Sequence, residues 1–178
     1  NRDDLREISI VDTPGLNDPI ASRTDKTKQF IEKCDVVYFL SPASRFLDKS
    51  DVDLLTAQLP QKGVKRLVLI CSRYDDGLTD TIYDKGGLVE ADIDTKYRLK
   101  RIASKTFAKV MEGYQTRGAS KELVSIISEC QKPIFVSSMT HNMSSKQKDE
   151  YTEDELIVYK NLNLDDELDA EKLRGIGN

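Results

Sequence analysis

The stretch Val11–Gly15 (VDTPG) decides how this chain is interpreted, because it joins a strand pattern to a turn with useful chemistry. The apolar residues from Leu5 to Val11 predict a strand that ends at Asp12. A carboxylate at a strand end can hold Mg²⁺ through water, and the backbone N–H of Gly15 can approach a phosphate oxygen because no Cβ intervenes. Turns favour the same residue types, so the motif gains weight only from the order of later motifs in the chain.

The composition fits an ordinary globular protein. The chain has 178 residues, of which 33% are charged and 38% hydrophobic, and this length is enough for one domain with a core. A net charge of −4 argues against nucleic-acid binding. The longest apolar runs, 36–40 and 67–71, are too short to cross a bilayer. Three widely spaced cysteines and the absence of a secretory signal predict a cytoplasmic protein, with peripheral membrane contact left open.

Strand and helix patterns alternate along the chain. We expect strands at 5–11, 35–41, 64–72 and 133–138, and helices at 24–34, 50–59, 95–112, 121–130, 153–160 and 166–173. A long loop is expected at 73–94 and a polar stretch at 141–149. This order predicts an α/β fold, with a mostly parallel sheet in a three-layer α/β/α arrangement. Ligands bind at the carboxyl ends of the strands in such sheets.

Two further motifs stand at predicted strand ends, namely 71–75 (CSRYD) and 136–139 (VSSM). With VDTPG, they resemble the later part of a translation-factor-type P-loop GTPase domain, of the kind found in bacterial dynamin-like and related large GTPases. VDTPG matches the third of the five motifs of that family. SRYD stands where the family has Asn/Thr-Lys-x-Asp, and SSM stands where it has Ser-Ala-Lys. The resemblance spans residues 5–139.

The resemblance implies a role for each residue of the two later motifs. Asp75 would accept hydrogen bonds from N1–H and the 2-amino group of guanine. The stem of Arg73 would lie along the base, beside Ser72. Ser137 and the backbone of Ser138 would contact the base from the other side.

At the phosphate end, the resemblance implies that Asp12 holds Mg²⁺ through water and that Gly15 senses the γ-phosphate of GTP. Loss of that contact on hydrolysis to GDP would release the loop 16–23 as a switch. The implied cofactors are therefore GTP or GDP and Mg²⁺. No catalytic residue is assigned, because Leu16 stands where some small GTPases place a water-orienting Gln.

The sequence departs from the family pattern in three respects. Ser72 replaces Asn or Thr of the fourth motif, and Met139 replaces Lys of the fifth. A phosphate loop of the form Gly-x-x-x-x-Gly-Lys-Ser/Thr is missing; the stretch 113–120 imitates it but has Ala119 in the place of Lys and follows a predicted helix. We therefore expect the phosphate loop upstream of Asn1, and GTP hydrolysis only in the intact parent protein.

The expected organisation is the C-terminal part of a GTPase domain at 1–150, including an insertion within 76–131, and a helical extension at 151–178. The expected partners are a guanine nucleotide and, by analogy, a second copy or another protein at 76–131. The basic residues between 96 and 109 form either a membrane-facing or a solvated helix face, of which the solvated face is the simpler interpretation. Two alternatives to a GTPase remain: a pseudo-GTPase scaffold without turnover, and a nucleotide-free α/β interaction domain.

Overall fold

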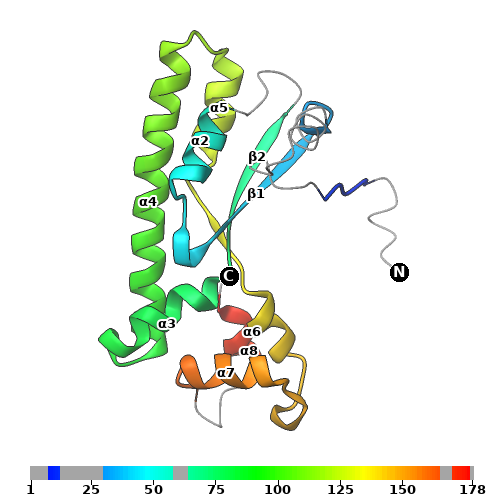
Figure 1. Ribbon diagram of the computed structural model, residues 1–178, viewed down its shortest axis with the longest axis vertical. Coiled ribbons are helices and arrows are strands. Elements are labelled where there is room, and N and C mark those ends of the chain that lie inside the picture. Colours follow the sequence, from blue (N-terminus) through cyan, green and yellow to red (C-terminus); the bar gives the residue numbers. More distant parts are fainter. Residues whose placement is uncertain (1–7, 13–29, 58–63, 165–169, 177–178) are drawn as a thin grey trace.

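A computed structural model describes residues 8–12, 30–57, 64–164 and 170–176 (Figure 1). Its strands are β1 (Val36–Pro42), β2 (Arg66–Ser72) and β3 (Ile134–Phe135). Its longer helices are α2 (Lys49–Ala57), α3 (Tyr74–Lys85), α4 (Leu88–Thr116), α5 (Lys121–Glu129) and α7 (Glu153–Asn161). Shorter helical segments are η2 (Ala43–Arg45), α6 (Ser138–Met143), η3 (Lys148–Glu150) and α8 (Ala170–Gly175).

The three strands form a parallel sheet in the order β1-β2-β3. The crossover from β1 to β2 contains α2, and the crossover from β2 to β3 contains α3, α4 and α5. The register pairs Phe39 with Leu69 and Cys71 with Phe135. The carboxyl ends of β2 and β3 therefore meet at one edge of the sheet. The predicted α/β fold class with a parallel sheet is confirmed.

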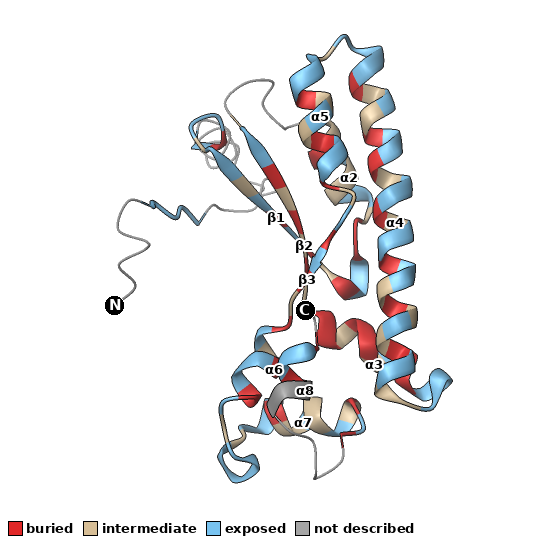
Figure 2. Ribbon diagram, turned by 180° about the vertical axis from the view of Figure 1, so that it is seen from behind, coloured by how far each residue is buried: buried red, intermediate tan, exposed pale blue. Residues whose placement is uncertain are grey.

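The two faces of this sheet differ in burial. Side chains alternate between the faces along each strand, and the face toward α2, α4 and α5 carries the buried side chains of Phe39, Leu69 and Phe135. Figure 2 shows these helices on one side of the sheet. The other face carries apolar side chains that are exposed among the described residues, namely Val36, Tyr38, Leu40 and Ile134. The continuous apolar run of β1 therefore alternates in burial, although its sequence predicted a strand covered on both sides.

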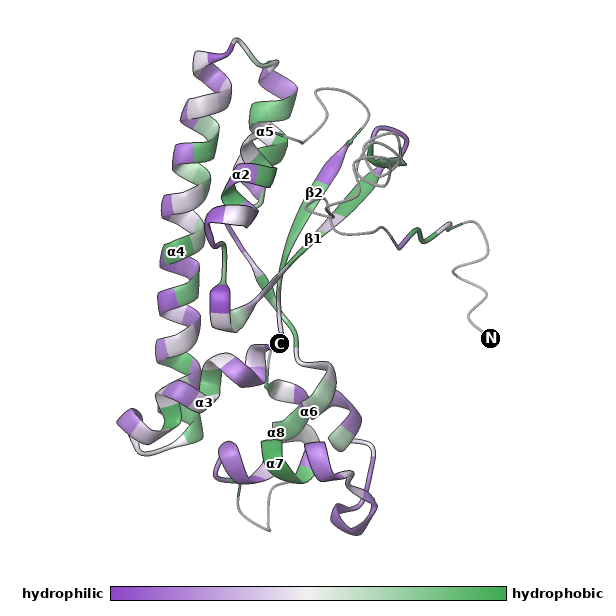
Figure 3. Ribbon diagram, viewed as in Figure 1, coloured by the Kyte–Doolittle hydropathy of each residue, from purple (hydrophilic) through white to green (hydrophobic). Residues whose placement is uncertain are grey.

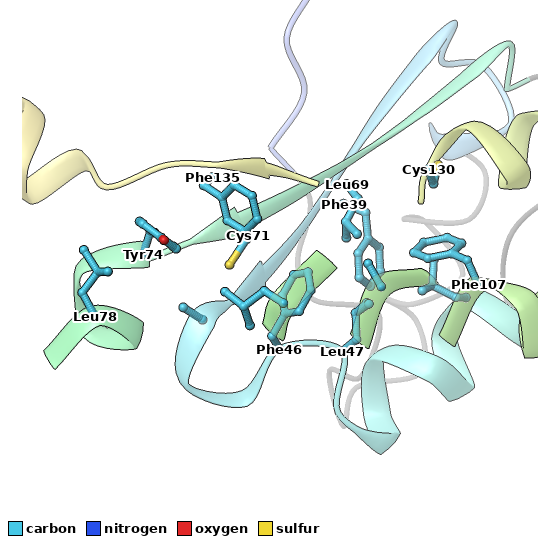
Figure 4. Close-up of a cluster of buried hydrophobic side chains, with 14 of the residues drawn as sticks. Phe39, Phe46, Leu47, Leu69, Cys71, Tyr74, Leu78, Phe107, Cys130 and Phe135 are labelled. Carbon is cyan, nitrogen blue, oxygen red and sulfur yellow. The ribbon is translucent and has the colours of Figure 1, made fainter. Parts of the chain in front are cut away.

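The core lies between the sheet and the helices and is built from buried aliphatic and aromatic side chains (Figure 4). Phe107 of α4 is fully buried there, and burying a side chain of this kind contributes about 1.5–3 kcal/mol. Two long-range hydrogen bonds add to this packing. The Tyr114 hydroxyl donates to the Leu55 carbonyl at 2.8 Å, and the Cys130 thiol donates to the Leu67 carbonyl at 2.9 Å. These contacts attach α4 to α2 and the end of α5 to β2.

Most predicted elements are confirmed in the described residues, with ends that shift by a few positions. The helix expected at 95–112 is longer than predicted, because α4 begins at Leu88 and runs to Thr116. The strand expected at 133–138 is confirmed only as the two-residue β3. The helix expected at 24–34 falls largely outside the described residues, which show Phe30 and Ile31 as helical.

Two predictions about local structure are wrong. Residues 8–11 of the expected first strand are not in a strand, and the rest of that strand lies outside the described residues. The expected loop at 73–94 contains α3 and the start of α4. For the stretch 141–149 the sequence indicated only polarity, and the structure places the second half of α6 and the start of η3 there.

Helix α3 forms because its apolar residues recur at helical spacing. Tyr74, Leu78 and Ile82 are buried one turn apart. The helix ends at Gly86, which has φ +76° and whose N–H donates to the Ile82 carbonyl at 3.0 Å, as expected for a glycine that terminates a helix. The glycines of this stretch had suggested a loop, although one of them is a helix-ending residue.

Candidate functional site

Two of the predicted site residues meet at the carboxyl edge of the sheet. Asp75 follows β2 in the first turn of α3, and Ser137 follows β3 as the residue before α6. The Ser137 hydroxyl donates to Asp75 Oδ1 at 2.6 Å, across 62 positions of sequence. Both residues are buried, with 7% and 6% of their surface exposed. The structure thus brings together the second and third motifs found in the sequence.

The hydrogen bonds of the Ser137 hydroxyl show what this side chain does. A hydroxyl has one proton to donate, and here Asp75 receives it. The oxygen also accepts a hydrogen bond from the Thr140 N–H at 3.2 Å and so caps the N-terminus of α6. Ser137 therefore orients the Asp75 carboxylate and fixes the start of α6, and its contact with a base stays a prediction.

The two oxygens of the Asp75 carboxylate differ in their hydrogen bonds within the described residues. Oδ1 accepts from Ser137, and within the described part of the chain no hydrogen bond or ion pair reaches Oδ2. A buried carboxylate is stable where hydrogen-bond donors and a helix N-terminus surround it, and Asp75 stands in the first turn of α3. Its free oxygen can accept a hydrogen bond from an N–H group that enters the site.

Tyr74 fixes the backbone next to Asp75. Its N–H donates to the Val136 carbonyl at 3.1 Å, and its ring centroid lies 5.0 Å from that of Phe135. Its hydroxyl donates to Asp92 Oδ1 of α4 at 3.0 Å. The close-up in Figure 4 shows Tyr74 beyond the end of β2 and Phe135 on the neighbouring strand β3, next to Cys71. These contacts bind the loop after β2 both to β3 and to α4.

Two buried groups of this region, Tyr74 and Cys71, have raised pKa values. Burial raises the pKa of Tyr74, and the nearby Asp92 carboxylate adds to that shift. Burial also raises the pKa of the Cys71 thiol to about 12. Cys71 is therefore a protonated core residue, and neither group is an available nucleophile or base.

Arg73 is exposed and adopts an unusual backbone conformation. Its φ of 50° places it in the left-handed region, which costs about 1–2 kcal/mol for a residue with a Cβ. Its Nε lies 2.9 Å from Asp76 Oδ2, so the guanidinium is attached to the first turn of α3. The side chain is therefore held next to the first turn of α3, which contains Asp75.

The other two residues of the base motifs lie at the same edge. Ser72 ends β2 and is half-buried. Ser138 begins α6 and is exposed. The roles that the resemblance implies for Ser72, Arg73 and Ser138 stay predictions.

The phosphate-end residues are not assembled in the described structure. Asp12 is exposed, and the segment 8–12 extends away from the sheet (Figure 1). Within the described residues, no hydrogen bond or ion pair joins Asp12 to Asp75 or Ser137, and no group of three metal-ligating side chains is found. Gly15 and the loop 16–23 lie outside the described residues.

The sequence did not identify Tyr74, Asp92 and Phe135 as parts of this region. Tyr74 lies inside the SRYD motif, and the helical spacing of Tyr74, Leu78 and Ile82 would have shown that its side chain is buried. The contact with Asp92 joins positions 18 residues apart on two helices, and no local pattern reveals it.

Part of the chain is similar to known proteins. Residues 2–72 match the Dynamin family. The chain is 31% identical over 93 residues to Dynamin-like protein 1 of Campylobacter jejuni, a stretch that covers 52% of this chain and 12% of that protein. It is 34% identical over 71 residues to a probable transmembrane GTPase, FZO-like and chloroplastic, of Arabidopsis thaliana, covering 40% of this chain and 8% of that protein.

These similarities support a dynamin-like GTPase domain. The aligned stretches span about a tenth of the length of either relative, so they concern one part of a domain. No solved structure matches this chain significantly. None of the described helices is both long enough and apolar enough to cross a membrane.

Proposed function

We propose that this part of the protein holds the base of a guanine nucleotide at the carboxyl edge of the sheet. The observation that carries the proposal is the buried hydrogen bond between Ser137 and Asp75, which presents an oriented carboxylate with a free oxygen. A carboxylate can accept from both N1–H and the 2-amino group of guanine. Adenine lacks that pair of donors at the corresponding positions, so the site distinguishes the two purines.

The proposal assigns a distinct role to each neighbouring residue. Arg73 lays its stem along one face of the base, Ser72 supports the loop, and the backbone of Ser138 contacts the other side. Ser137 acts through Asp75. The strained backbone of Arg73 supports this assignment, because such conformations cluster at ligand sites.

At the other end of the nucleotide, Asp12 is proposed to hold Mg²⁺ through water, and Gly15 to contact the γ-phosphate. One exposed carboxylate fits this chemistry, since Mg²⁺ keeps several waters and binds one or two carboxylates together with substrate phosphates. Mg²⁺ would neutralise the charge that develops on the phosphates. Leu16 cannot orient water, so hydrolysis requires another group or a partner.

In the whole protein we propose GTP hydrolysis with a switch at 16–23 that drives assembly or membrane-associated work in the cytoplasm. A phosphate loop of the usual form is not among these 178 residues and would come from elsewhere in a longer protein. The division into a GTPase part at 1–150 and an extension at 151–178, and the insertion at 76–131, remain predictions.

The alternative is a pseudo-GTPase that retains the fold as a scaffold. It is favoured by Met139, which stands in the place of a lysine, and by the Arg73 guanidinium, which is already bound to Asp76. This alternative predicts a folded protein that binds neither guanine nor adenine nucleotides.

The two functions are separated by equilibrium titration of the intact protein with Mg²⁺-GTP and Mg²⁺-ATP. Saturable GTP binding with little ATP binding supports the base site. Ser137→Ala is the matched variant, because it keeps Asp75 and removes the donor that orients it, together with the hydroxyl that caps α6. It should weaken GTP binding by about tenfold, the equivalent of about 1.4 kcal/mol. Binding of GTP and ATP with equal affinity contradicts the proposal, and binding of neither favours the scaffold.

A further inference from the structure

One row of side chains on α4 contacts two aromatic residues at the carboxyl edge of the sheet. Asp92, Lys96 and Lys100 stand at intervals of four and are therefore neighbours on this helix, along which hydrophilic residues recur between hydrophobic ones (Figure 3). The Tyr74 hydroxyl lies 3.0 Å from Asp92 Oδ1 and 3.2 Å from the Asp92 carbonyl oxygen. The ammonium groups of Lys96 and Lys100 each lie 5.9 Å from a ring centroid, that of Tyr74 and that of Phe135 respectively. This row joins α4 to both aromatic residues.

Tyr74 stands next to the proposed base-binding residues in the chain. It directly precedes Asp75, and Val136 directly precedes Ser137. The Tyr74 N–H donates to the Val136 carbonyl at 3.1 Å, and the Ser137 hydroxyl donates to Asp75 Oδ1 at 2.6 Å. Two hydrogen bonds therefore join the same two segments at adjacent positions. A displacement of Tyr74 would change the position of the Asp75 carboxylate relative to Ser137.

Asp92 is well placed to hold Tyr74. Its Oδ1 accepts from the Tyr74 hydroxyl, and its Oδ2 lies 3.0 Å from Lys96 Nζ. The side chains of Asp92 and Lys96 are only 26% and 20% exposed, so water weakens these charge-assisted contacts less than it would at the surface. The residue before Tyr74 is Arg73, whose φ of 50° persists only where the surrounding structure imposes it. The contact of Tyr74 with Asp92 is one such constraint.

From these contacts we infer that Tyr74 and Asp92 are positioning residues that set the guanine specificity of the site through Asp75. This inference rests on the proposed function, in which the Asp75 carboxylate accepts from both N1–H and the 2-amino group of guanine. An acceptor that serves two donors at once must be held in position more closely than one that serves a single donor. Loss of the contact between α4 and Tyr74 should therefore reduce the preference for GTP over ITP, because the base of ITP lacks the 2-amino group.

The rival interpretation is that the contact only stabilises the packing of α3 against α4. A second hydrogen bond joins the same two helices, since the Thr95 hydroxyl of α4 donates to the Thr81 hydroxyl of α3 at 3.0 Å. Both threonines are buried, and Thr81 lies six positions after Asp75 in the chain. A purely structural role predicts that Tyr74→Phe and Thr95→Val both lower stability and leave the nucleotide preference unchanged. Thr95→Val is therefore the matched control.

Equilibrium titrations of the intact protein with Mg²⁺-GTP and Mg²⁺-ITP test the inference. Tyr74→Phe keeps the buried ring and should raise the Kd for GTP by about fivefold and that for ITP by less than about twofold, with unchanged stoichiometry. Thr95→Val should leave the ratio of the two Kd values as in the wild type. Equal ratios in the two variants, with the wild type still preferring GTP to ATP, would overturn the inference and leave the base site in place. A wild-type protein that binds neither GTP nor ITP would reject the proposed function, and the inference with it.

Substitution of Asp92 gives a second test from the side of α4. Asp92→Leu removes the carboxylate and leaves the backbone carbonyl at 3.2 Å, so it should reduce the GTP preference less than Tyr74→Phe does. Asp92→Asn keeps an acceptor oxygen for the Tyr74 hydroxyl and should recover the preference that Asp92→Leu loses. A GTP-to-ITP ratio that is the same in Asp92→Leu as in the wild type would exclude Asp92 as a positioning residue.

Discussion

Asp75 and Asp12 are assigned to the two ends of one nucleotide, yet the chain holds them very differently. Asp75 is buried and hydrogen-bonded, and the residue before it packs against both β3 and α4. Asp12 is exposed on a segment that extends away from the sheet. The proposed base end is thus held by elements that the structure describes, whereas within the described residues no hydrogen bond joins Asp12 to Asp75 or Ser137. The VDTPG motif is clear in the sequence, although the described residues do not assemble a phosphate site around Asp12.

The largest expected effect comes from the aromatic support of Asp75. Tyr74→Ala removes a fully buried ring and should lower the free energy of unfolding by about 3–5 kcal/mol. Tyr74→Phe keeps the ring and loses only the hydrogen bond to Asp92, at a cost of about 1 kcal/mol. In the segment that carries Asp12, Ile10→Ala alters an exposed residue and should change the free energy of unfolding by less than about 0.5 kcal/mol. Urea denaturation measures all three, and a cost for Ile10→Ala similar to that of Tyr74→Ala would contradict the contrast.

The next effect tests how closely α3 packs against η2. A Cβ at Gly77 would lie 2.9 Å from the Ala43 Cβ, so Gly77→Ala forces the two backbones apart and should cost about 1–3 kcal/mol. Gly113→Ala is the control. Gly113 lies in α4, and a Cβ there would have no neighbouring atom closer than 3.9 Å. Alanine favours a helix interior by about 1 kcal/mol over glycine, so this control should be stabilising. The same urea experiment would reject the close packing if both changes stabilised the protein.

A pH-dependent effect is expected in the helices that come after Ser137. The Lys146 ammonium donates to both Glu155 oxygens, at 2.7 and 2.9 Å, and with the Thr152 N–H it lowers the pKa of Glu155. A carboxyl whose pKa falls on folding stabilises the fold above its ordinary pKa, and the contribution is lost as the pH falls through the lower folded value.

Glu155→Gln should therefore destabilise the protein at pH 7 and less so near pH 3. Denaturation midpoints at the two pH values measure this, with Glu153→Gln, an exposed acid of the same helix, as the control. A loss of stability in Glu155→Gln that is the same at both pH values would show that the ion pair is not the source of the loss.

The smallest effect concerns the backbone of Arg73. Glycine adopts a positive φ without steric cost, so Arg73→Gly should leave stability unchanged or raise it by about 0.5 kcal/mol. Arg73→Val should instead lower it by about 1 kcal/mol or more, since a β-branched residue is strained there. A thermal midpoint that falls equally in both variants would rule out the left-handed conformation. GTP affinity of Arg73→Gly then reports the loss of the whole Arg73 side chain, including its ion pair with Asp76.

Sequence patterns predicted much of the fold and part of the site. β1, β2 and α5 could be predicted because strand and helix periodicities are local. Asp75 and Ser137 could be placed at one edge because parallel strands end on the same side. Helix α3 was missed because its closing glycines resemble loop residues, although Gly86 ends the helix. The link from Tyr74 to Asp92 depends on the packing of α3 against α4, which no local spacing encodes.

The most direct test of the base site is the substitution Asp75→Asn, which should change the preferred nucleotide from GTP to XTP. Asp75→Asn replaces an acceptor with a side chain that can donate to the C2 carbonyl of xanthine. Our account predicts that GTP binding to the intact protein falls by about a hundredfold, from the loss of two charge-assisted hydrogen bonds, while XTP binding rises. A folded Asp75→Asn variant that binds GTP as the wild type does, and gains nothing for XTP, would contradict it.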